Sequence, residues 1–119
     1  MKLTSIMIGT EDLDRLAGYY TKVFGEPQWN EAGYVGWGFD DGGGFAVGQH
    51  DGVKGRNEQP GRVIWNLDSN DVAGDFARLK AAGATVVQEP YQPGGPDTGM
   101  WIATFSDPDD NYFQLMSPM

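Results

Sequence analysis

The sequence contains the same pattern of segments twice, each copy about half the length of the chain, and this repeat limits the possible folds more than any other feature. Each copy has a short β-type segment, an amphipathic helical segment and three further β-type segments. The helices are predicted to begin at Asp12 and Asp71, 59 positions apart, and to end at Gly25 and Gly83, 58 positions apart. Because the two offsets nearly agree, the pattern indicates a duplicated βαβββ unit.

The first copy shows the pattern most clearly. Thr10 is the expected N-cap of its helix, followed by acidic residues that suit the positive end of the helix dipole. The apolar face of this helix consists of Leu13, Leu16, Ala17, Tyr20 and Phe24. We expect strands at residues 3–8, 28–30, 34–39 and 45–49.

The second copy is predicted to have strands at residues 62–67, 85–88, 100–105 and 112–116. Between the copies, residues 51–61 are rich in glycine and charge, which predicts an exposed linker. We therefore expect a single domain over residues 1–119, with module one at 1–50 and module two at 62–119.

Three motifs resemble a known superfamily over the whole chain. They are Asp12-Leu13 through Tyr19-Tyr20 to Phe24-Gly25, the run from Phe76 to Ala84, and Phe105-Ser106-Asp107-Pro108-Asp109-Asp110-Asn111. The sequence resembles the glyoxalase, bleomycin-resistance and extradiol dioxygenase proteins, also called vicinal oxygen chelate proteins. The resemblance implies an α+β fold, in which two tandem βαβββ modules form a curved-sheet cup with helices outside. Asp110 stands where the family normally has glycine, and aspartate tolerates a left-handed turn better than most residues.

Many members of this superfamily bind a divalent metal in the cup. Carried over one at a time, the four ligand positions fall on Ser5, Val47, Ile64 and Gln114. A divalent cation prefers carboxylates, imidazoles or thiolates, and the chain has no cysteine. We therefore expect no metal, no cofactor and no catalytic residue of the family type.

A small-molecule site on the cup face is the alternative that the residues favour. Strand alternation groups Ser5 with Met7, and Tyr112 with Gln114, while Asn66 is expected on the same face. Such a mixture of amides and apolar walls is typical of ligand pockets. Gln114 and Asn66 could instead simply bond to each other or to water.

Two tryptophans and the single histidine are further candidates. Trp101 is the preferred aromatic wall of the site, and Trp65 is the second choice, although tryptophans also fill small cores. His50 could contact a ligand or act as a base, or it could be an exposed residue at the end of a strand.

Charge narrows the choice of partner. Seventeen acidic and eight basic residues give a net charge of −9, which disfavours nucleic acid and favours cationic ligands. No apolar run is long enough to span a membrane, and the first residues do not resemble a secretory signal, so we expect a cytoplasmic protein.

The sequence predicts a metal-independent small-molecule-binding protein. The resemblance and the charge favour one that sequesters a cationic or aromatic compound, as the bleomycin-resistance branch does. Two alternatives remain open. The chain could be a lyase, isomerase or dioxygenase of the glyoxalase type, or an accessory domain with a vestigial cup. A homodimer is expected, because pairing covers exposed sheet edges.

Overall fold

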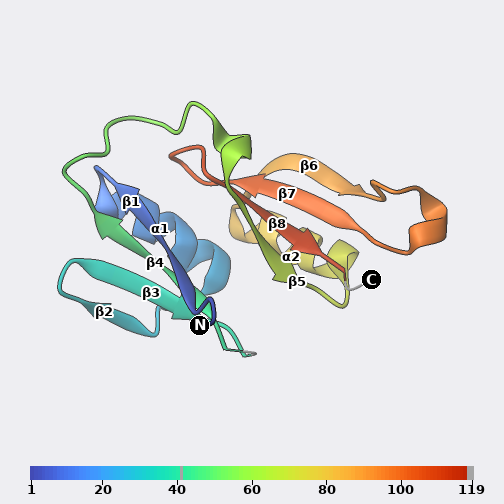
Figure 1. The fold of residues 1–119 in the computed structure, drawn as a ribbon, viewed down its shortest axis with the longest axis horizontal. Coiled ribbons are helices and arrows are strands. Elements are labelled where there is room, and N and C mark those ends of the chain that lie inside the picture. The colour runs from blue at the N-terminus through green and yellow to red at the C-terminus, as the bar shows by residue number, and fades with distance from the viewer. Residues whose placement is uncertain (41, 118–119) are drawn as a thin grey trace. The chain divides into compact units, whose positions relative to one another are not determined.

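The computed structural model describes residues 1–40 and 42–117 and divides into two compact units that meet between Arg56 and Asn57 (Figure 1). Each unit is a βαβββ module, so the predicted α+β duplication is confirmed. Among the described residues, no helix is long and apolar enough to cross a membrane.

Module one contains a four-stranded sheet and one helix. Its elements are β1 (Ser5–Thr10), α1 (Leu13–Phe24), β2 (Trp29–Glu31), β3 (Tyr34–Gly38) and β4 (Gly44–Gln49). The strand order is β1-β4-β3-β2, with β1 parallel to β4 and the other pairs antiparallel.

Module two repeats this arrangement. Its elements are β5 (Ile64–Asp68), α2 (Val72–Ala82), β6 (Thr85–Tyr91), β7 (Ile102–Ser106) and β8 (Tyr112–Met116). One 3-10 turn, Pro60–Arg62, precedes β5, and another, Pro96–Thr98, lies between β6 and β7. The strand order is β5-β8-β7-β6, with β5 parallel to β8. Strand β6 runs three residues past the expected end at Gln88, with two shifts of register on the way.

Aromatic rings join each sheet to its helix. In module one, Phe45 of β4 lies 4.9 Å from Tyr20 of α1 and 5.0 Å from Trp37 of β3, between ring centroids. In module two, a continuous stack runs from Phe76 of α2 through Phe105 and Phe113 to Trp65, with steps of 5.4, 5.3 and 5.2 Å. These rings occupy one face of each sheet, and alternation sends the intervening residues to the other face.

Both helices begin in the same way. The expected N-cap, Thr10, is wrong by two residues, because Asp12 accepts from the Arg15 N–H at 3.2 Å. Asp71 likewise accepts from the Gly74 N–H at 3.0 Å. Thr10 instead accepts from the Asp12 N–H and so orients the capping residue.

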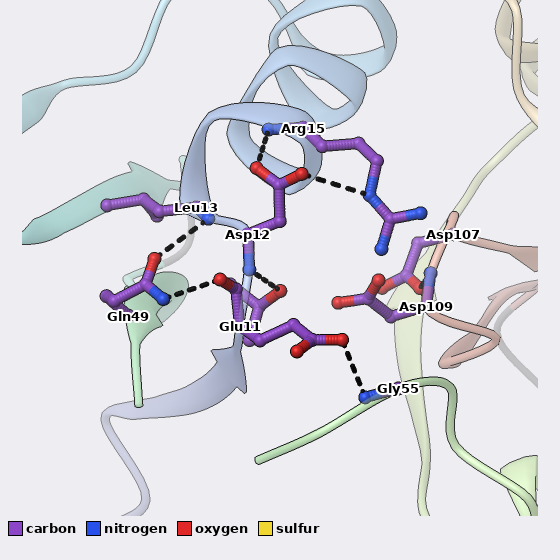
Figure 2. A network of polar contacts seen from close by, with 9 residues as sticks. Glu11, Asp12, Leu13, Arg15, Gln49, Gly55, Asp107 and Asp109 are labelled. Carbon is purple, nitrogen blue, oxygen red and sulfur yellow. Dashed lines mark hydrogen bonds and ion pairs between the residues drawn. The ribbon is translucent and has the colours of Figure 1, made fainter. Parts of the chain in front are cut away.

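Polar contacts fix the end of β4 to the start of α1 (Figure 2). Gln49 accepts from the Leu13 N–H at 3.1 Å and donates to the Glu11 carbonyl at 2.6 Å. The Glu11 carboxylate accepts from the Gly55 N–H at 2.8 Å, so the first part of the predicted linker is held against module one.

The turn between β7 and β8 depends on Asp107, which is 2% exposed. Its carboxylate accepts from the backbone N–H groups of Asp109 and Asn111 at 2.8 and 3.0 Å. Asp110 adopts the left-handed conformation expected for it, with φ 63°. The Asn57 N–H donates to the Asp109 carbonyl at 2.7 Å, which ties the other end of the linker to this turn.

We expect Asp107→Ala to lower the free energy of unfolding by about 2–4 kcal/mol, because it leaves the N–H groups of Asp109 and Asn111, one buried and one partly buried, without their acceptor. Asp97→Ala removes the same charge from an exposed turn and should change stability by no more than about 0.5 kcal/mol. Urea unfolding followed by circular dichroism measures both. Equal effects of the two substitutions would contradict this role for Asp107.

Candidate functional site

A row of uncharged polar side chains crosses the sheet of module two on the face opposite α2. Gln114 pairs with Asn66 of β5 on one side and with Thr104 of β7 on the other. The Gln114 amide nitrogen donates to the Thr104 hydroxyl at 3.0 Å. Thr104 is buried and Asn66 is exposed, so the row runs from the interior of the sheet to an accessible edge.

The predicted members of this face lie together. Tyr112 is opposite Ile64 and Ser106, one step along β8 from the row. Phe113 and Leu115 are buried on the α2 side, whereas Tyr112 and Gln114 remain partly accessible. The alternation predicted for this strand is therefore confirmed. Gln114 bonds to Thr104 and not to Asn66, and Thr104 was missed because its partner is ten residues away in the sequence.

Ser5 and Met7 lie on the corresponding face of module one. They are opposite Gly44 and Ala46 of β4, and Met7 is 63% exposed. The residues on the α1 side of this sheet are large and apolar, while those opposite α1 include several glycines.

His50 follows β4 and is exposed. Its Nδ1 atom accepts from the Gly52 N–H at 3.0 Å. In the neutral ring the proton then resides on Nε2, so the imidazole presents a donor and not a base to its surroundings. This arrangement favours a hydrogen bond to a ligand over general-base catalysis.

The two candidate tryptophans occupy different places. Trp65 stacks on Phe113 at 5.2 Å and faces α2, away from Asn66. Trp101 lies just before β7 and is 41% exposed; its N–H donates to the Ser117 hydroxyl at 2.7 Å, and its carbonyl accepts from the Ser117 N–H at 3.0 Å. If the alternation of β7 continued back by one residue, Trp101 would lie on the side of Ala103 and not of Thr104. Its role as a ligand wall stays a prediction.

The model of the glyoxalase-like domain matches residues 5–116, which is nearly the whole chain. The chain belongs to the glyoxalase-like domain family. No curated protein matches the sequence.

Solved structures share the fold of this glyoxalase-like domain. A glyoxalase-related enzyme from Fulvimarina pelagi is 21% identical, with a TM-score of 0.74 over 99% of this chain and 88% of the other. A glyoxalase/bleomycin resistance protein/dioxygenase family enzyme from Burkholderia phytofirmans PsJN is 19% identical, with a TM-score of 0.72 over the full length of both chains. A hypothetical protein from S. aureus is 21% identical, with a TM-score of 0.73 over 99% and 94% of the two chains. At these identities the likeness establishes the fold alone.

The residues at the family's metal positions do not suit a divalent ion. The position predicted at Val47 is wrong, because the Val47 side chain is fully buried on the α1 side of the sheet and does not reach the opposite face. The neighbours on the other face are Ala46 and Gly48, which also lack donor atoms. Among the described residues, no three His, Asp or Glu side chains gather where they could hold a metal. Gln114, whose amide already bonds to Thr104, is a poor ligand by itself.

We expect the protein purified after expression in metal-supplemented medium to contain less than about a tenth of an equivalent of zinc, nickel, iron or manganese, because amide and hydroxyl side chains bind these ions weakly. Inductively coupled plasma mass spectrometry measures this. One bound equivalent that disappears in Gln114→Leu or His50→Ala would refute the expectation.

Proposed function

We propose that this glyoxalase-like domain is a metal-independent binding protein for a small molecule, and that the polar row of module two forms part of the site. The observation that carries the proposal is the Asn66–Gln114–Thr104 row, which supplies donors and acceptors from three adjacent strands. A few convergent polar groups beside apolar side chains are typical of ligand sites.

Hydrogen-bonding capacity remains in this row. The bond to Thr104 uses one N–H of Gln114 and leaves its carbonyl oxygen and second N–H. The Asn66 side chain makes no hydrogen bond to the described part of the chain. Tyr112 lies one step along the strand and adds an aromatic ring. The row therefore favours a ligand with both polar and aromatic parts.

Charge supports a cationic compound. The chain has a formal net charge of −9, and long-range attraction would raise the rate at which cations reach it. Sequestration of such a compound needs binding and no reaction. An enzyme of the glyoxalase type would need a Lewis acid or a base, and neither the metal positions nor His50 favours one.

We expect Gln114→Leu to keep the fold and to weaken the binding of any ligand that uses the amide by about 1–3 kcal/mol, because the ligand would lose the free carbonyl oxygen and second N–H of Gln114. A screen of cationic glycopeptides, flat aromatics and dicarbonyl adducts by thermal shift, followed by calorimetry, measures this. Glu89→Gln, on an exposed edge strand, is a control with unchanged affinity. If no compound shifts the melting temperature, the vestigial alternative replaces binding.

We expect Trp101→Ala to weaken ligand binding by roughly 1–3 kcal/mol, the range for loss of a stacking platform, with most of the change in the dissociation rate. The salt dependence of association should stay unchanged, because the substitution alters no charge. Stopped-flow fluorescence separates the two rates. A substitution that leaves the dissociation rate unchanged would remove Trp101 from the site.

We also propose a cytoplasmic homodimer with two-fold symmetry. Strand β1 is an edge strand of its sheet and contains no proline, so it could accept a partner. Light scattering at micromolar concentration should give about twice the mass of 13.0 kDa. A monomeric mass would count against the dimer.

A further inference from the structure

One face of the sheet in module one is rich in glycine. The side chains opposite α1 come from alternate positions of four strands, and five of these positions are glycine: Gly9, Gly36, Gly38, Gly44 and Gly48. The same strands direct Phe45, Val47 and Trp37 to the α1 side, where all three are buried. The glycine-rich face of the sheet therefore lies opposite a face that is fully packed against α1.

Two aromatic side chains lie directly on this glycine surface. A Cβ atom added to Gly36 would lie 1.9 Å from the indole of Trp29, and one added to Gly48 would lie 2.6 Å from the ring of Tyr34. The glycines therefore allow each ring to rest on the backbone of the next strand. Trp29 and Tyr34 remain 40% and 41% exposed, so both rings stay accessible to a ligand.

A tight turn places a carboxylate beside these rings. Ala32 and Gly33 both have positive φ, 58° and 83°, as a two-residue hairpin turn requires. The turn pairs Glu31 directly with Tyr34, on the same face as Trp29. Glu31 is exposed and is the only formally charged residue in the four strands of this sheet.

We propose that Trp29, Tyr34 and Glu31 form a recognition site for an organic cation that carries a flat ring. The ring faces attract positive charge, and a flat ligand stacks on them. The carboxylate of Glu31 makes no ion pair with the described part of the chain and supplies the opposite charge. This inference rests on the proposed small-molecule-binding function and assigns part of the binding to module one.

The carboxylate of Glu31 favours a cationic ligand over a neutral one. A neutral aromatic compound, or an apolar surface of a second copy, would displace water from Glu31 without supplying a positive charge. Removing water from an unpaired carboxylate costs free energy, whereas a cation offsets this cost. The arrangement therefore favours a cationic ligand over either alternative.

The test uses N-methylquinolinium as the cationic probe and quinoline as its neutral counterpart at neutral pH, followed by proton–nitrogen correlation NMR of the whole chain. We expect N-methylquinolinium to shift the indole N–H signal of Trp29 and the amide signals of Glu31 and Gly36. The indole of Trp37, which is buried on the α1 side and donates to the Gly25 carbonyl, is an internal control and should shift much less.

Four substitutions, one of them a control, separate the effect of charge from that of stacking. Glu31→Gln should weaken the binding of N-methylquinolinium roughly three- to fivefold and leave the binding of quinoline unchanged. The control Glu89→Gln removes a carboxylate from a strand of module two and should change the affinity of neither probe. Trp29→Ala should lower the affinity for both probes, by about tenfold for the cation. Trp29→Phe keeps a ring and should restore most of the affinity, which excludes a loss caused by unfolding.

The outcomes distinguish this site from the polar row. A shift of the Trp29 signal that does not respond to Glu31→Gln would mean non-specific stacking and would overturn the proposal. Binding that survives Trp29→Ala but is lost in Gln114→Leu would also overturn it, while leaving the proposed function intact. Loss of cation binding in Glu31→Gln and Trp29→Ala, with Gln114→Leu unaffected, would support it even if the polar row binds nothing.

Discussion

Aromatic rings packed between each sheet and its helix fix which face of the sheet is buried, and the rest of each module depends on that choice. Phe45 packs against Tyr20 in module one, and Phe105 packs against Phe76 in module two. Side chains alternate along a strand, so burial of these rings determines which residues remain on the other face. The polar row of module two and the pair of Trp29 and Tyr34 in module one lie on that second face.

The two modules use that second face differently, although they share one topology. Module two carries the hydrogen-bonded pair of Gln114 and Thr104, beside the exposed Asn66. Module one carries glycines covered in part by Trp29 and Tyr34. Duplication conserved the packing between sheet and helix because each module needs that core. The second face is free of this requirement and could diverge toward amide chemistry in one module and ring stacking in the other.

Alternation was predictable only where large and small residues contrast clearly. In β8, Phe113 and Leu115 differ in polarity from Gln114, so the face was assigned correctly. In β4, Val47 and Ala46 are both apolar, and the sequence alone gave no means to decide which one faces α1. The N-cap at Asp12 was missed for a related reason, since Thr10 is an equally suitable residue two positions earlier.

The amino-acid sequence by itself determined the duplicated βαβββ unit, the acidic charge and the family resemblance, because these follow from spacing and composition along one chain. Only the tertiary structure decided that Thr104 lies beside Gln114, that Trp29 rests on Gly36 and that Glu31 faces Tyr34. Such neighbours depend on the register between strands. Register is set by packing against the helix and by turn geometry, and a shift of one residue would move every side chain to the opposite face.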